Sequence, residues 1–234
     1  MDGPALIRSL SVTADQPGGI FVQAKIDQDH WSLTQLIGSA GFYFIEVALT
    51  PYLNLRKSPV LDEFDRDPAS FLRGRFELGE IDFGPLDRED NSQCQAVREI
   101  AGSSFKDDRF HLDPNCDSGT AHRRYQLWVD QMLAEDTNQF YIMTHGNQVM
   151  AFMVQRGTRL PLAGFAQSFT RSGLGDFFWL STLSQMRRQK LSRVSTGIST
   201  NNTAILNLYA RLGFRFRNPT AVFHYWSMPK VQVV

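Results

Sequence analysis

Two segments of this 234-residue chain, 172 positions apart, carry the same succession of patterns, and this repeat constrains the fold more than any other feature. In the first, the β-like run 22–26 leads through apolar residues at helical spacing to Gly-Phe-Tyr-Phe at 41–44. In the second, the run 194–198 leads through a similar stretch to Gly-Phe-Arg-Phe at 213–216. A Gly just past a helix commonly adopts the left-handed conformation that ends it. Both segments therefore predict a strand, a helix and a second strand.

The two copies differ in their polar residues. At the offset of 172, Ile37 stands where the second copy has Tyr209, and His30 stands where it has Asn202. The first copy keeps the packing residues and loses these polar groups, so we expect the chemistry to lie in the second copy. The sequence thus predicts an N-terminal partial unit with a connector over residues 1–90 and a complete domain over residues 91–234.

Charge and hydrophobicity exclude several classes of protein. The 24 Lys and Arg residues balance 24 Asp and Glu, so no net positive field would hold the chain on a phosphate backbone, and we expect no nucleic-acid partner. Apolar runs such as 177–180 are far shorter than the ~20 residues of a membrane-spanning helix. Residues 1–4 lack the start of a secretory signal, and Cys94 and Cys116 lack metal-ligand spacing. We expect a cytoplasmic protein with reduced thiols, no metal and no membrane span.

The rest of the chain alternates between strand and helix patterns. Residues 56–91 are charged and interrupted by Pro, and they predict a connector with one short strand near 80–83. Beyond it, apolar spacing predicts helices at 95–105, 118–135, 176–189 and 202–211, a hairpin of strands at 140–144 and 148–154, and strands at 162–169, 194–198 and 222–226. This order is typical of a mixed α/β (α+β) domain.

A Gly-containing loop lies between the predicted strand 162–169 and the helix that follows it. The run Thr170-Arg171-Ser172-Gly173-Leu174-Gly175 would direct backbone N–H groups and the positive end of the helix toward one point. Such a cradle holds a diphosphate without a cluster of basic side chains. The alternative is a plain strand-to-helix turn, which the same residues would also form.

The segment that follows carries a resemblance to a known family. Asn202, then Leu208-Tyr209, then Gly213-Phe214, resembles the acetyl-CoA-binding end of the GNAT acyltransferases, in which a Q/R-x-x-G-x-G/A loop precedes these residues. Gly173 and Gly175 match that loop, whereas Thr170 stands at its Gln/Arg position. The resemblance implies a mixed, mostly antiparallel central sheet flanked by helices, with an N-terminal degenerate half-GNAT, and acetyl-CoA as co-substrate.

The resemblance also implies roles for individual residues in direct acetyl transfer to an amine. Tyr209 would be the general acid that protonates the leaving thiolate. Asn202 would bind the pantetheine arm, cap the following helix, or do both. A backbone N–H between Gln167 and Phe169 would stabilise the developing oxyanion. The predicted cofactor-binding residues are Gln167, Ser168, Phe169, Thr170, Arg171, Ser172, Gly173, Leu174, Gly175, Asp176, Asn202 and Tyr209.

The general base is predicted to be Glu46. Period-2 alternation would place it on the strand face of Phe42 and Phe44, where aromatic surroundings would raise its pKa. The alternative is a solvated Glu at the edge of a strand. The His residues are interpreted as structural or exposed.

The predicted substrate-binding residues lie where acceptors enter GNAT folds. Arg109, Phe110, Tyr125 and Trp128 could hold a nucleotide diphosphate and its base, or could form an ordinary helix surface. The run 22–26 and Gly41-Phe42, with Ser104-Phe105 and 108–110, further resemble bacterial TDP-fucosamine acetyltransferases.

These resemblances imply N-acetylation of a small primary amine, with a nucleotide-linked amino sugar of the dTDP-4-amino-4,6-dideoxyhexose type as the favoured acceptor. The alternatives are an amino acid, an antibiotic or a protein N-terminus as acceptor, or an acyl-CoA-binding module without catalysis. A homodimer formed through an unpaired strand edge is one alternative for the oligomeric state.

Overall fold

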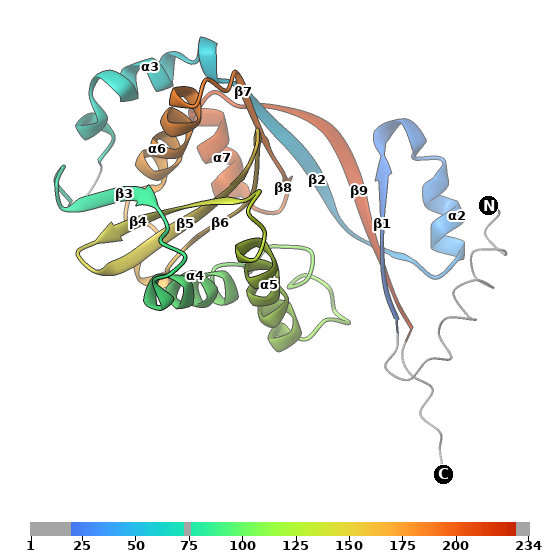
Figure 1. Ribbon diagram of the computed structural model, residues 1–234. Helices are drawn as coiled ribbons and strands as arrows, with labels where there is room; N and C mark the ends of the chain where they lie inside the picture. Colours follow the sequence, from blue (N-terminus) through green and yellow to red (C-terminus); the bar gives the residue numbers. More distant parts are fainter. Residues whose placement is uncertain (1–19, 73–75, 228–234) are drawn as a thin grey trace.

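A computed structural model describes residues 20–72 and 76–227 of the chain, and its centre is one mixed sheet (Figure 1). Neighbouring strands in the sheet are antiparallel except for one parallel pair, β6 and β7. In sheet order the strands are β1 (Ile20–Asp27), β9 (Arg215–Ser227), β2 (Tyr43–Asn54), β7 (Arg193–Thr196), β6 (Arg159–Phe165), β5 (Gln148–Arg156), β4 (Gln139–His145) and β3 (Ile81–Pro85), with the short β8 (Ile198–Ser199) also paired to β2. The predicted mixed, mostly antiparallel sheet is confirmed.

Helices cover both faces of this sheet. α4 (Asn91–Ser103) and α5 (Ser118–Leu133) lie on one face. α3 (Pro59–Arg66), α6 (Gly175–Arg188) and α7 (Thr203–Arg211) lie on the other. β1, β9 and β2 extend together away from this body, with α2 (Leu33–Ser39) beside them (Figure 1). The four 3-10 turns are η1 (Gln28–His30), η2 (Leu55–Lys57), η3 (Pro68–Phe71) and η4 (Gln167–Phe169).

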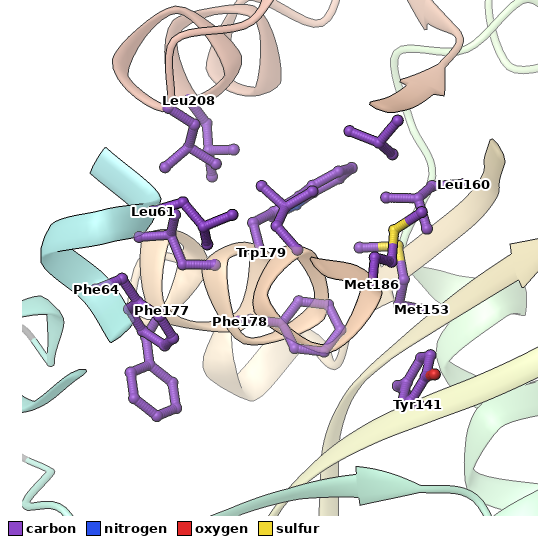
Figure 2. Close-up of a cluster of buried hydrophobic side chains, with 14 of the residues drawn as sticks. Leu61, Phe64, Tyr141, Met153, Leu160, Phe177, Phe178, Trp179, Met186 and Leu208 are labelled. Carbon is purple, nitrogen blue, oxygen red and sulfur yellow. The ribbon is translucent and has the colours of Figure 1, made fainter. Parts of the chain in front are cut away.

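The largest core surrounds α6. Met186 of this helix lies beside Met153 of β5 and Leu160 of β6, whereas Phe177 packs on Phe64 of α3 (Figure 2). Trp179 packs on Tyr209 of α7. Burial of one such side chain contributes roughly 1.5–3 kcal/mol relative to leaving it in water. The helix that follows the Gly-containing loop is therefore held rigidly against the sheet.

The connector predicted over 56–91 is wrong in one respect, because it contains a helix. Ser58 caps α3 by accepting a hydrogen bond from the N–H of Leu61 at 3.4 Å, and Pro59 occupies the first turn. Leu61 and Phe64, three residues apart, are buried against α6. The flanking charges hid this short amphipathic pattern, whereas the predicted short strand is confirmed as β3.

The two repeat copies form the same unit of strand, helix and strand. Gly41 and Gly213 have positive φ values of 87° and 83°. The residue after each Gly donates its backbone N–H to the carbonyl five residues earlier, at 3.1 Å in the first copy and 2.9 Å in the second. The units share one sheet, since β2 lies between β9 and β7. The division of the chain at residue 90 stays a prediction.

The parallel pair β6 and β7 is short, and the sheet opens beyond it. The pairing covers only Arg159 with Ser195 and Leu160 with Thr196. The chain then turns away, and β8 pairs with β2 instead. The Thr196 hydroxyl donates to the Leu160 carbonyl at 2.8 Å, at the point where the strands part. Residues 162–165 of β6 consequently have an edge without a strand partner on this side among the described residues.

Candidate active site

The segment after β6 differs from the prediction. The predicted strand 162–169 ends at Phe165, and Gln167–Phe169 forms the 3-10 turn η4. The Phe169 N–H already donates to the Ala166 carbonyl at 2.9 Å, so it is not a free oxyanion donor. The oxyanion donor stays a prediction for Gln167 and Ser168, whose backbone N–H groups have no partner among the described residues.

The Gly-containing loop forms a turn with free backbone donors. Arg171 and Gly173 have positive φ values of 63° and 85°, and no side chain caps the N-terminus of α6. No described residue accepts a hydrogen bond from the backbone N–H of Gly173, Gly175 or Asp176. Free N–H groups at a helix N-terminus suit an anion such as a diphosphate.

The side chains of this loop have other partners. The Thr170 hydroxyl donates to the Gln167 carbonyl at 2.7 Å, and Leu174 is buried in the core. Asp176 accepts a hydrogen bond from Arg211 of α7 at 2.8 Å. Arg171 is the exception, since its exposed guanidinium has no hydrogen bond or ion pair with a described residue. The backbone N–H groups and this one basic side chain are thus the parts of the loop that are free to hold a ligand.

Tyr209 lies at the opening of the sheet. Its ring is buried against Trp179 and Phe214, with ring centroids 4.8 and 5.0 Å away. Burial raises the pKa of its phenol, and a hydrogen bond with Thr196 opposes this shift. The phenol therefore stays protonated at neutral pH, beside the residue where β6 and β7 part, and is able to donate a proton.

Asn202 caps α7. Its side-chain oxygen accepts a hydrogen bond from the Ile205 N–H at 3.1 Å, which confirms the capping interpretation. Its part in binding pantetheine stays a prediction.

The predicted face for Glu46 is wrong. A β-bulge between Phe44 and Glu46 shifts the register, so Glu46 pairs with Val222 while Tyr43 pairs with His224. Val222 and His224 are two residues apart on β9 and share a face, which places Glu46 on the Tyr43 side, opposite Phe44. The extra residue, Ile45, reverses the alternation on which the prediction relied.

The surroundings of Glu46 raise its pKa, as predicted, though the cause is burial rather than aromatic rings. The residue is 2% exposed, and its Oε1 lies 3.7 Å from Arg109 Nη1. Burial raises the pKa of the carboxyl, while a hydrogen bond with Ser199 of β8 and the Arg109 charge lower it to a smaller extent. Its Oε2 is buried without a partner among the described residues. A carboxylate in this state is suited to accept a proton.

A cleft of ≈ 480 Å³ lies between α5 and the β1–β9 strands. Its walls include Phe21, Phe110, Arg123, Arg124, Trp128 and Trp226. The exposed Arg124 guanidinium stacks on the Phe110 ring at 4.1 Å, and no described carboxylate forms an ion pair with it. The cleft therefore combines aromatic rings with a cation that has no acidic partner in the part of the chain that the structure describes.

The four predicted substrate residues do not all reach this cleft. Phe110 and Trp128 line it. The Arg109 guanidinium lies 5.1 Å from the centre of the Phe110 ring and also forms the ion pair with Glu46. Tyr125 is only 5% exposed, and its ring stacks on Phe105 at 4.1 Å inside the core. The structure thus joins three of these residues and places Tyr125 among packing residues.

A polar cluster that the sequence did not indicate lies under the cleft. The buried Asp113 carboxylate accepts hydrogen bonds from the Tyr43 hydroxyl at 2.7 Å, His224 Nδ1 at 2.7 Å and Trp226 Nε1 at 2.8 Å. Burial acts to raise the pKa of Asp113, but these hydrogen bonds outweigh it and lower the pKa. The one available signal was His224, an ionisable residue within the otherwise apolar and aromatic strand 222–226.

Two kinds of feature are absent from the described residues 20–72 and 76–227. They contain no group of three His, Cys, Asp or Glu residues placed to hold a metal ion. In the same residues, every helix is too short or too polar to cross a bilayer.

Comparison with known proteins identifies the fold. No family model matches the chain. The spore coat polysaccharide biosynthesis protein SpsD of Bacillus subtilis is 23% identical over 167 residues, which is 70% of this chain and 53% of that protein. The chain thus spans about half the length of this relative.

Solved structures match over most of the chain at low sequence identity. A GCN5-related N-acetyltransferase from Sphaerobacter thermophilus superposes with a TM-score of 0.61 and 13% identity, covering 91% of this chain and 62% of that one. A tandem GNAT protein from the clavulanic acid biosynthesis pathway has a TM-score of 0.61 and 10% identity, covering 96% and 69%. A GCN5-related N-acetyltransferase from Kribbella flavida has a TM-score of 0.55 and 11% identity, covering 96% and 76%. The chain has the GNAT acyltransferase fold.

Proposed function

We propose that this protein is an N-acetyltransferase that moves the acetyl group of acetyl-CoA to the primary amine of a small acceptor. One observation carries the proposal. The protonated phenol of Tyr209 lies beside Thr196, where the sheet opens, and Glu46 lies close to Ser199 of β8, which pairs with β2 at Ala48. An acid and a base would therefore flank the same opening.

The free N–H groups of Gly173, Gly175 and Asp176 would bind the diphosphate of the coenzyme. The unpartnered edge of β6 at 162–165 would bind the pantetheine arm and supply an N–H to the carbonyl oxygen that becomes negative. The loop and the strand edge would thus orient the thioester toward the opening.

Acid and base chemistry would follow from the two titratable side chains. As the amine nitrogen bonds to the thioester carbon, Glu46 accepts the amine proton and the carbonyl electron pair moves to oxygen. When that pair returns, the carbon–sulfur bond breaks and Tyr209 donates its proton to the thiolate. The proton on Glu46 then returns to Tyr209 through solvent, so the reaction yields the amide and the free thiol.

For the acceptor we infer a nucleotide-linked amino sugar of the dTDP-4-amino-4,6-dideoxyhexose type. The cleft supports this choice, because Trp128 and Trp226 offer faces for a base, and Arg124 offers a guanidinium for a diphosphate. Arg109 contacts both Phe110, which lines this cleft, and Glu46, where the amine would react. The name of SpsD, which refers to polysaccharide biosynthesis, is consistent with a sugar acceptor.

The central test replaces Tyr209 with Phe. We expect thiol release to fall about 10²- to 10⁴-fold, the usual contribution of a general acid, while calorimetry finds acetyl-CoA binding unchanged. Tyr141→Phe is the matched control, since Tyr141 is also a buried phenol but lies on β4, which β5 and β6 separate from β7, and accepts a hydrogen bond from Gln189. Full turnover by Tyr209→Phe would remove Tyr209 from the mechanism.

The acceptor is tested by thiol release with a panel of amines that contains the nucleotide amino sugar, amino acids, an aminoglycoside and a peptide. Arg124→Ala should raise KM for the nucleotide sugar and leave KM for the same sugar without nucleotide unchanged. Arg98→Ala, which removes a pair with Asp130 between α4 and α5, is the control. Binding of acetyl-CoA without turnover of any amine would instead favour a non-catalytic acyl-CoA-binding module.

A further inference from the structure

A buried histidine lies directly beneath the cleft. His224 is 0% exposed, and its ring is 4.8 Å from that of Phe21 and 5.6 Å from that of Phe110, centroid to centroid. Both of these aromatic residues line the cleft. The imidazole therefore packs directly against the aromatic wall of the cleft in which the acceptor would bind. Neither the acid step nor the base step of the proposed mechanism uses it.

Asp113 determines which ring nitrogen of His224 carries the proton. Each oxygen of this carboxylate accepts two hydrogen bonds, Oδ1 from the Tyr43 hydroxyl and the Asn115 N–H, and Oδ2 from His224 Nδ1 and Trp226 Nε1. An ionised carboxylate can only accept, so Nδ1 must be the protonated nitrogen. The neutral ring then presents a lone pair at Nε2.

The surroundings of His224 favour this neutral ring. Burial lowers its pKa most, Asp113 opposes the shift, and the positive charges of Arg109 and Arg124 lower the pKa further. With two cations nearby, a charged imidazolium would be repelled, which leaves Nε2 as a hydrogen-bond acceptor rather than a cation.

The acceptor atom at Nε2 has no donor. It is buried and unpartnered among the described residues, as are Gln23 Oε1 and Glu46 Oε2. Gln23 is the partner of His224 across β1 and β9, and Glu46 lies on the same face of β2. A buried acceptor without a donor costs roughly 1–3 kcal/mol, so such groups call for a partner. Arg109 Nε, a donor beside Glu46, is also buried without a partner among the described residues. Three acceptors and one donor therefore call for a bound molecule that both donates and accepts hydrogen bonds, as a hydroxyl group does.

We propose that His224 is a specificity-determining residue, whose Nε2 accepts a hydrogen bond from a hydroxyl or N–H group of the bound acceptor, and that Asp113 is the positioning residue that maintains the required tautomer. This inference rests on the proposed function and deepens it. A lone pair at Nε2 accepts a hydrogen bond from a sugar hydroxyl. The proposal therefore predicts a preference for an amine that carries a hydroxyl or N–H group at this position over the same amine without it.

The substitution His224→Asn tests the role of Nε2. Its side-chain amide keeps an N–H near the position of Nδ1 for Asp113 and removes the acceptor at Nε2. We expect KM for dTDP-4-amino-4,6-dideoxyhexose to rise about 3- to 10-fold, the effect of one neutral hydrogen bond, with kcat and KM for acetyl-CoA nearly unchanged. His122→Asn, an exposed position on α5, is the matched control. An unchanged acceptor KM in a folded His224→Asn protein would overturn the proposal.

The second measurement begins with the wild-type protein, so its result does not depend on whether a variant folds. Nitrogen NMR of the histidine rings should identify His224 as the Nδ1–H tautomer, and titration with the nucleotide amino sugar should shift the Nε2 resonance. Asp113→Asn should move the proton to Nε2, because its amide donates to Nδ1, and should raise the acceptor KM as His224→Asn does. An Nε2–H tautomer in the wild-type protein contradicts the inference.

Failure of this proposal is distinguishable from failure of the proposed function. Thiol release with an unchanged Nε2 resonance at saturation removes the role of His224 and leaves the transferase standing. Acceptor binding with a shifted resonance but no thiol release supports the role of His224 and removes the transfer. Absence of binding of the nucleotide amino sugar, measured by tryptophan fluorescence, removes this acceptor and the role of His224, and thiol release with the other amines of the panel then decides whether the transferase stands.

Discussion

Replacement of Glu46 by Gln should change stability in a way that depends on pH. Burial raises the pKa of this carboxyl above its ordinary value of 4.5, so the folded protein holds the proton over a range in which the unfolded chain has lost it. A folded state that binds more protons than the unfolded state loses stability as pH rises. The contribution of Glu46 is thus fully present below pH 4.5 and is lost as pH rises through the higher folded-state pKa.

The magnitude follows from linkage. Each unit by which the folded pKa exceeds the unfolded value costs the wild-type protein about 1.4 kcal/mol once Glu46 is ionised. The substituted amide does not titrate, so the free energy of unfolding of Glu46→Gln relative to wild type should increase by about 1.4 kcal/mol per pH unit across this window and then level off. The Arg109 charge attracts only the ionised carboxylate, so its effect is already contained in the folded-state pKa and adds no separate offset.

Urea unfolding of both proteins between pH 4 and pH 8 measures this difference, with Glu63→Gln on the exposed side of α3 as the matched substitution. The same Glu46→Gln protein should lose about 10²- to 10⁴-fold in kcat, since its amide cannot accept the amine proton. A stability difference that shrinks with rising pH would mean that Arg109 outweighs burial and would refute the reasoning.

Three further predictions follow from the packing around the site. Gly173→Ala, at a φ of 85°, should lower the free energy of unfolding by about 1–2 kcal/mol and weaken acetyl-CoA binding in calorimetry, whereas Gly157→Ala, at 57° in the β5–β6 turn, should affect stability alone. Phe64→Ala should cost about 3–5 kcal/mol in urea unfolding, and a loss below about 1 kcal/mol would contradict the docking of α3 on α6. Thr196→Val should lower the free energy of unfolding by about 1–3 kcal/mol, because the Leu160 carbonyl loses its hydrogen bond, and should reduce kcat. The control Thr182→Val, which removes a buried hydroxyl inside α6, should retain full kcat.

Local patterns in the sequence were enough to predict the repeat and its ends. The left-handed Gly41 and Gly213, the Asn202 cap and the free loop before α6 all depend on residues within a few positions of one another. Short-range backbone chemistry of this kind can be inferred from residue types alone.

Long-range features of the site could not be predicted in this way. The bulge at Ile45 reverses the side on which Glu46 lies, and counting by twos assumes a regular strand. Asp113 and His224 are 111 positions apart and meet only because a loop folds over β9. The Ser58-Pro59 signal for α3 was present, but the charged residues around it resembled a connector.

The interleaving of β2 between β9 and β7 has a consequence for the order in which the molecule assembles. During synthesis, β1, α2 and β2 emerge from the ribosome long before the two strands that flank β2, from which they are separated by more than a hundred residues. Strands that are far apart in the sequence pair slowly, and their edges are prone to aggregation while they are unpaired. β1, α2 and β2 therefore pair with their neighbours long after they are made, and the Glu46 side of the site forms only after β9 has been made.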